Sequence, residues 1–122
     1  MGTENEIIEK IENTLNAAIS DLIKKENCNN PDWTRRIKTD LAALGKDSDF
    51  SACAHSVDTA SDWGEWLYDV CWLDYQDIDN YPVVKKMGLA VESEWGTTDE
   101  KIFEDFQKLL VCNAEFKLMI FQ

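Results

Sequence analysis

The chain has 122 residues, enough for one domain with a hydrophobic core, and 44% of them are apolar and 11% aromatic. Its 24 acidic against 12 basic residues give a formal net charge of −12, which disfavours a broad nucleic-acid-binding surface. No apolar run approaches the roughly 20 residues of a membrane span, and the charged N-terminus lacks an apolar signal region. We therefore expect a soluble, cytoplasmic domain over residues 1–122 that has no membrane partner.

Two amphipathic helices are predicted in the N-terminal third of the chain. Between residues 4 and 25 the apolar side chains recur at steps of three and four, which places them on one face of a helix. Pro31 suits the first turn of a second helix over residues 32–44, and Gly45 is expected to end it. Residues 1–27 are thus an N-terminal helical segment, and residues 31–122 form the core of the domain.

The pattern then changes to that of strands. Residues 50–56 alternate loosely, residues 63–73 form an aromatic and apolar run with Asp69 in its middle, and residues 88–95 form a third run. The segment 74–86 between the last two is rich in Asp and Asn, so we expect a hairpin or a short excursion there.

A helix and a last strand are predicted at the C-terminal end. Thr97 and Glu100 have capping-box spacing, and the helix that they begin should end near Asn113. Residues 116–121 predict a final strand that is buried on both faces. The element order is α-α-β-β-β-α-β, which indicates an α/β (α+β) domain. Its last strand–helix–strand unit implies a right-handed crossover and a central mixed sheet flanked by helices.

Three carboxylates stand at strand positions where packing alone would favour apolar side chains. Glu92 and Glu94 are two residues apart and share one face of their strand, and Asp69 interrupts the preceding apolar strand. Neighbouring carboxylates repel each other and resist desolvation, so we expect water, a cation or a basic partner beside them. If the two strands are neighbours, these oxygen ligands suit Mg²⁺ or Mn²⁺. A solvated strand face is the alternative interpretation.

The order of these elements and acids resembles the core of the PD-(D/E)XK (restriction-endonuclease-like) nuclease superfamily, which is helix, three strands, helix and strand. The resemblance covers roughly residues 32–122 and implies that fold for the chain. The segments that carry it are the acidic strand EWLYDV at 65–70, the motif strand LAVESEW at 89–95, the helix segment DFQKLL at 105–110 and the closing strand FKLMIF at 116–121.

The resemblance implies a Mg²⁺- or Mn²⁺-dependent phosphodiesterase, a hydrolase that acts on DNA. Asp69 matches the metal-binding Asp, Glu92 matches the first acid of the (D/E)-x-K motif, and Glu94 stands where the motif has its lysine. Some members use Glu at that position, and the lysine can migrate to the following helix, where Lys108 or Lys101 is available. The candidate catalytic residues are Asp69, Glu92, Glu94 and Lys108, and the first three are the candidate metal ligands. A solvated helix surface is the alternative for both lysines.

The net charge favours a rival hypothesis, a non-catalytic binding or immunity-type protein on the same fold whose partner is a basic protein. A third hypothesis is that the chain is one piece of a larger nuclease, with DNA affinity supplied by a partner subunit or an oligomer. The basic pairs at residues 24–25, 35–36 and 85–86 are the places where a DNA site could be locally positive.

Two other features of the sequence could be functional sites or could serve only for packing. Cys53 and His55 stand two apart and are a candidate ligand pair, with packing of a small core residue as the alternative. The five Trp residues favour core and sheet-face packing, with a base-stacking platform as the alternative. No C-x-x-C motif occurs, and the isolated glycines exclude a phosphate-binding P-loop.

Overall fold

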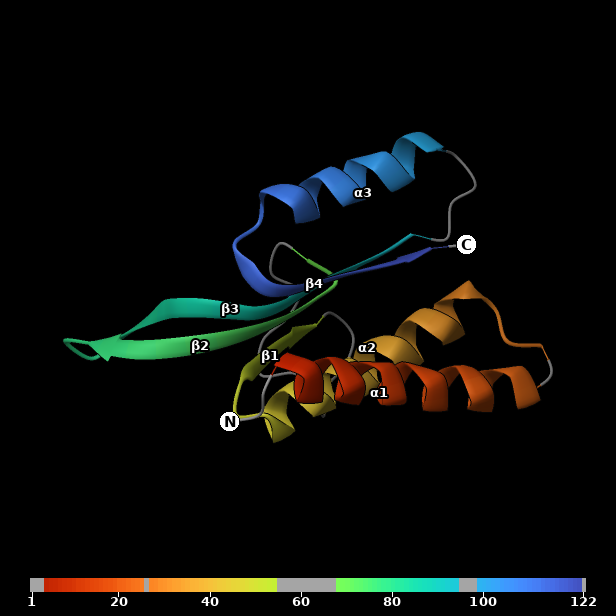
Figure 1. The fold of residues 1–122 in the computed structure, drawn as a ribbon, viewed down its shortest axis with the longest axis horizontal. Helices are drawn as coiled ribbons and strands as arrows, with labels where there is room; N and C mark the ends of the chain where they lie inside the picture. Colours follow the sequence, from red (N-terminus) through yellow and green to blue (C-terminus); the bar gives the residue numbers. More distant parts are fainter. Residues whose placement is uncertain (1–3, 26, 55–67, 95–98, 122) are drawn as a thin grey trace.

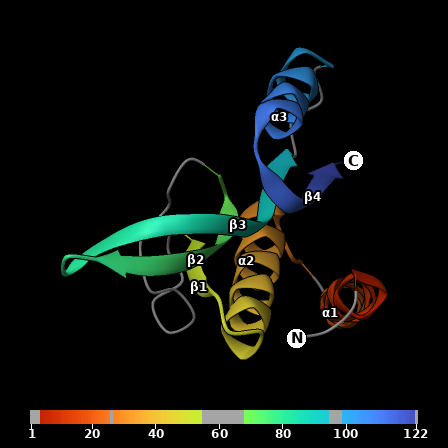
Figure 2. The same cartoon turned by 60° about the vertical axis from the view of Figure 1, so that its left-hand side comes forward.

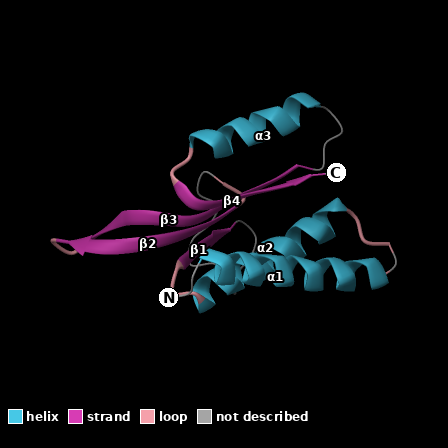
Figure 3. Ribbon diagram, viewed as in Figure 1, coloured by secondary structure: helices cyan, strands magenta, loops and turns pink. Residues whose placement is uncertain are grey.

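The computed structural model describes residues 4–25, 27–54, 68–94 and 99–121 of the chain, which form an α+β structure. The elements follow the predicted order (Figures 1 and 3): α1 (Glu4–Lys24), α2 (Asn30–Asp47), β1 (Ser51–Ala54), β2 (Val70–Ile78), β3 (Tyr81–Glu94), α3 (Asp99–Val111) and β4 (Ala114–Phe121). None of the helices in these segments is both long and apolar enough to cross a membrane.

The four strands form one mixed sheet in the order β1-β2-β3-β4, which is also their order in the chain. The pairs β1–β2 and β2–β3 are antiparallel, whereas β3 and β4 are parallel and are joined by α3. Helices α1 and α2 lie on one face of the sheet, and α3 lies on the other (Figures 1 and 2). The general α/β class and the mixed sheet flanked by helices are therefore confirmed.

Helix α2 begins as predicted but ends later. Asn29 caps it, because its side chain accepts a hydrogen bond from the Asp32 amide while the Asp32 carboxylate accepts one from the Asn29 amide, and Pro31 lies in the first turn. The prediction that Gly45 ends the helix is wrong, because α2 continues to Asp47. Gly45 lies against the Trp72 indole, where an added Cβ would come within 2.4 Å of the ring. The absence of a side chain at Gly45 therefore lets the Trp72 ring pack closely against the backbone of α2.

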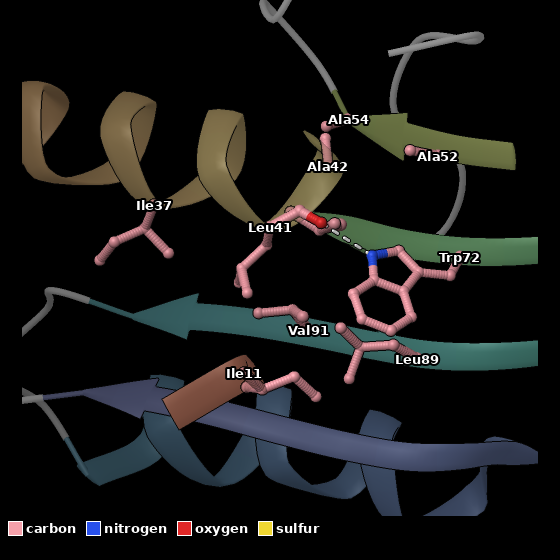
Figure 4. Close-up of a cluster of buried hydrophobic side chains, with 10 residues drawn as sticks. Ile11, Ile37, Leu41, Ala42, Ala52, Ala54, Trp72, Leu89 and Val91 are labelled. Carbon is pink, nitrogen blue, oxygen red and sulfur yellow. Dashed lines mark hydrogen bonds between the residues drawn. The ribbon is translucent and has the colours of Figure 1, made fainter. Parts of the chain in front are cut away.

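The main core lies between the sheet and the two N-terminal helices. Trp72 is at its centre: its indole Nε1–H donates a hydrogen bond of 2.9 Å to the Leu41 carbonyl of α2, and its ring stacks on Phe50. Figure 4 shows the apolar side chains that the helices and strands contribute to this core, with the Trp72 indole beside Leu41 of α2. The buried members of this core are Ile11, Ile37, Leu41, Ala42, Ala52, Ala54, Val70, Trp72, Leu89 and Val91.

The strand boundaries differ from the prediction on both sides of the central hairpin. Asp69 lies in a bend one residue before β2 and not in the middle of a strand, and residues 63–67 lie outside the described part of the chain. Segment 74–86 forms the arm of a hairpin. Strands β2 and β3 stay paired along this arm as far as the two-residue turn that joins them. The turn residues Asp79 and Asn80 both have positive φ, of 51° and 69°, as turns of this length require.

Strand β4 is the second open edge of the sheet, opposite β1. The prediction that this strand is buried on both faces is wrong, because none of its eight residues is buried. The physical reason is that, among the described residues, β4 pairs with β3 alone, and that an apolar groove of about 170 Å³, lined by Ile8, Leu15, Phe116 and Leu118 among others, separates it from α1.

Candidate functional site

The predicted site residues come from three elements that meet at one end of the sheet. Asp69 directly precedes β2, Glu92 and Glu94 lie at the end of β3, and Lys108 lies in α3. The register pairs Val70 with Val91, so that the residues next to this pair, Asp69 and Glu92, are close in space. The predicted convergence of strand acids and a helix lysine is therefore present in the structure.

Asp69 makes two hydrogen bonds to Ser93, the residue between the two glutamates. Its Oδ2 accepts from the Ser93 amide at 2.7 Å and from the Ser93 hydroxyl at 3.0 Å. The register of β2 with β3 starts at Val70, so the Asp69 carboxylate gives the Ser93 amide a hydrogen-bond partner just outside the paired residues. Asp69 therefore has a structural role in addition to any role in catalysis.

Glu92 is buried and forms an ion pair with Lys108. Only 4% of Glu92 is exposed, and its Oε1 lies 3.2 Å from the Lys108 ammonium nitrogen. The same ammonium lies 5.4 Å from the centre of the Tyr68 ring, whose hydroxyl donates to the Lys108 carbonyl at 3.4 Å. Val91, the neighbour of Glu92, belongs to the core under α1 and α2, so strand alternation points Glu92 towards α3.

The electrostatics of this cluster favour protonation of two of its carboxyls. Burial, reinforced by the charge of Asp69, raises the pKa of Glu92 from 4.5 to about 7, although Lys108 acts in the opposite direction. Burial and the nearby Glu94 raise the pKa of Asp105, which is the fourth acid of the site. The cluster thus contains more negative charge than its one lysine offsets.

Asp105 and Ser93 belong to the cluster, although the sequence pattern did not predict either of them as a site residue. Asp105 precedes Lys108 by three residues, so its position on the same side of α3 was visible in the spacing. Nothing in the sequence indicated the bonds from Ser93 to Asp69, since they depend on where strand pairing stops. Lys101, the other candidate lysine, has no ion pair with a site acid in the described part of the chain, whereas Lys108 has one.

The donor set is chemically suited to a divalent cation. Carboxylate oxygens are preferred ligands of Mg²⁺ and Mn²⁺. A cation would offset the burial and, to a smaller extent, the repulsion between carboxylates, which together raise the pKa values of Glu92 and Asp105. The described residues offer Asp69 Oδ1 and Glu92 Oε2 for it, because the hydrogen bonds within these segments use the other oxygen of each carboxylate. As the side chains stand, no three acidic, thiol or imidazole groups among the described residues form a group that could hold a metal ion.

The other candidate features lie away from this cluster or outside the described residues. Cys53 is buried opposite Cys71 in the β1–β2 pair, and His55 lies outside the described residues. Trp72 belongs to the core and Trp33 packs against it. Trp63, Trp66 and Trp95 are not among the residues that the structure describes.

Two residues of the basic pairs, Arg36 and Lys86, form ion pairs with acids other than Asp69, Glu92 and Glu94. Arg36 of α2 is held by Asp21 and Asp40, on the opposite face of the sheet from α3. Lys86 pairs with Glu115 at 3.0 Å. Arg36 and Lys86 therefore do not supply the locally positive rim that is expected of a DNA site.

No protein-family model, curated protein or solved structure matches the chain. The functional interpretation consequently rests on the geometry of the residues themselves.

Proposed function

We propose that the chain is a Mg²⁺- or Mn²⁺-dependent phosphodiesterase of the PD-(D/E)XK type that acts on DNA. The observation that carries the proposal is the contact between Lys108 and the buried Glu92. In the motif strand Glu94 replaces the lysine of the family pattern, and a lysine from the next helix lies beside the first acid of the motif. The parallel β3–α3–β4 unit and the helices on both faces of the sheet are compatible with the restriction-endonuclease-like core.

In this proposal Asp69, Glu92 and Glu94 hold the cation and Lys108 faces the substrate. The bound cation would supply charge for the scissile phosphate and lower the pKa of an attacking water. Lys108, whose side chain is 45% exposed, can reach a phosphate oxygen while its ammonium stays near Glu92, and would there stabilise negative charge that develops in the transition state. The hydrogen bonds from Ser93 orient Asp69.

Binding of the cation requires Glu92 to release its proton, because a carboxylate ligand binds in its ionised form. Since the pKa of Glu92 is raised to about 7, we expect the affinity for Mn²⁺ to increase with pH from 6 to 8. Titration calorimetry at several pH values measures this slope. In Glu92→Gln the affinity should fall and the slope should flatten.

The catalytic test is cleavage of supercoiled DNA with Mn²⁺ or Mg²⁺. Lys108→Met should lower the cleavage rate by about 100-fold or more, as loss of a group that stabilises the transition state does. Lys101→Met is the matched control, since it removes a lysine from the same helix without touching the acids, and should retain the wild-type rate. A wild-type chain that neither binds Mn²⁺ nor cleaves DNA would refute the proposal, as would equal losses in the two lysine variants.

The net charge of −12 favours a second function, recognition of a basic protein without catalysis. In that case the acids Asp69, Glu94 and Asp105 contact Lys or Arg side chains of the partner. Under this alternative the chain binds no Mn²⁺, and Glu94→Gln weakens a salt-sensitive complex with one basic protein at physiological ionic strength. Retention of that complex in Glu94→Gln, together with Mn²⁺ binding by the wild type, would exclude it.

A further inference from the structure

The exposed large apolar side chains of the described residues fall into two groups. One group covers the hairpin arm and consists of Ile78, Tyr81, Val83 and Val84. The other group belongs to α1, α3 and the end of β4, and consists of Ile8, Ile19, Ile23, Phe103, Phe106, Leu110, Val111 and Phe121. The second group is distributed over all three layers of the fold.

In α3 the exposed apolar residues form a strip on the side of the helix turned away from the acidic cluster. Phe103, Phe106 and Leu110 are three and four residues apart, so they share one side of α3. At about 100° per residue, Phe106 lies roughly 160° around the helix from Lys108, which contacts Glu92 of β3. The strip therefore lies towards β4, whose Lys117 ammonium is 3.5 Å from the Leu110 carbonyl.

Helix α1 has a second strip of apolar side chains. It lies at the same β4 edge as the strip of α3, but on the opposite face of the sheet. Ile8 and Leu15 line the groove that α1 forms with β4. By helical spacing Ile19 continues this side of α1, one turn beyond Leu15, and it is exposed. The open edge of β4 thus has an apolar helix side on each face of the sheet.

Strand β4 itself is suited to pairing with another strand. About half of its eight residues present their backbone N–H and C=O groups on the side away from β3, and six of the eight side chains are apolar. The two charged side chains, Glu115 and Lys117, have opposite signs, and Glu115 is offset by Lys86. Natural sheets usually protect an edge of this kind with several charges, a proline or a covering element.

We propose that this edge, made of β4 with the apolar sides of α1 and α3, is the interface of a two-fold symmetric dimer of the chain. An axis perpendicular to the sheet and between the two β4 strands pairs them antiparallel. The same axis brings α1 against its copy on one face of the joined sheet and α3 against its copy on the other. Each apolar strip then meets an identical strip, as a two-fold interface requires.

The size of the edge is that of a stable dimer interface. Eight strand residues at ~3.4 Å each give a length of about 27 Å, and a sheet with a helix on each face is about 30 Å deep. The product is about 800 Å² on each partner, which is the area that a standard-size protein interface buries per partner. The hairpin arm, by contrast, is a two-stranded element that extends beyond the helices (Figure 1).

The dimer is tested by measuring the molar mass by light scattering during gel filtration over a range of concentrations, under reducing conditions. The wild-type chain should have twice its mass of 14.0 kDa at tens of micromolar. Ile19→Lys and Leu110→Lys each place a charge in one apolar strip and should raise the dissociation constant about tenfold or more. Because both side chains are exposed, the circular dichroism spectrum should not change.

Ile78→Lys is the matched control, since it makes the same substitution at an exposed isoleucine of the hairpin arm. It should leave the dimer intact. Hydrogen exchange should also show protection of outward-facing β4 amides that disappears on dilution. A wild-type chain that is monomeric at about 100 µM would overturn the proposal. So would a dimer that Ile78→Lys dissociates and the two strip variants do not.

Discussion

Replacing Glu92 by Gln tests whether a buried acid is destabilising at neutral pH. Gln has nearly the same shape and its side-chain oxygen can still accept a hydrogen bond from Lys108, but it carries no charge. In the native protein the pKa of Glu92 is raised from 4.5 to about 7. Between these two values the native state therefore holds a proton that the unfolded state has released.

The sign of the effect follows from proton linkage. Where the native state binds more protons, the free energy of unfolding falls as pH rises, so Glu92 destabilises the fold increasingly up to about pH 7. A displacement from 4.5 to about 7 corresponds to about 3 kcal/mol at 1.36 kcal/mol per pH unit. Between pH 5 and pH 8 we expect about 2 kcal/mol of this to appear as a gain in stability of Glu92→Gln relative to the wild type.

The assay is urea unfolding of both proteins at pH 5 and pH 8, with reduced cysteines. Using the difference between the two proteins removes the contributions of all other carboxyls, provided that they are unchanged. Glu104→Gln, which makes the same substitution at an exposed position of α3, is the matched control. The reasoning would be refuted if the difference in free energy of unfolding between Glu92→Gln and the wild type stays constant within about 0.5 kcal/mol between the two pH values, or shrinks towards pH 8.

Three further substitutions test the fold by urea unfolding. Trp72→Phe removes the hydrogen bond to the Leu41 carbonyl and should cost about 1–3 kcal/mol; a loss under about 0.5 kcal/mol would contradict the role of this bond. Gly45→Ala should destabilise by more than about 1 kcal/mol despite the better helix propensity of Ala, because its Cβ meets the Trp72 ring, and a stabilised variant would refute this. Asn29→Ala removes the cap of α2 and should cost about 1 kcal/mol, against no change if the capping box is unimportant.

The element order was predictable because it depends on local periodicity. Apolar residues recur at spacings of three and four in α1, α2 and α3, and this spacing predicts a helix whatever the helix packs against. The capping residues fix the start of α2. Gly45 was misinterpreted because its function depends on Trp72, a residue 27 positions later that packs against the helix. The burial of β4 was overestimated for a similar reason, since an apolar sequence does not reveal how many neighbours a strand has.

For the candidate site, residue types were predictable and their mutual contacts were not. The Glu-x-Glu spacing placed Glu92 on one face of β3, and strand alternation in the structure agrees with that. The contact of Lys108 with Glu92 depends on where α3 lies along β3, because Lys101 and Lys108 are two turns apart on the same side of the helix and the helix sequence leaves the choice between them open. The position of Asp69 in a bend depends on where β2 stops pairing with β3.

The strand order, which matches the order in the chain, has a consequence for how fast the protein folds. Each of the four described strands pairs only with strands next to it in sequence, and the β2–β3 hairpin closes through two residues. Little loop-closure entropy has to be lost before the first contacts form, and topologies of this local kind fold faster than those in which distant segments pair. We therefore expect the hairpin to form first and the parallel β3–β4 pair, whose connection contains α3, to form after it.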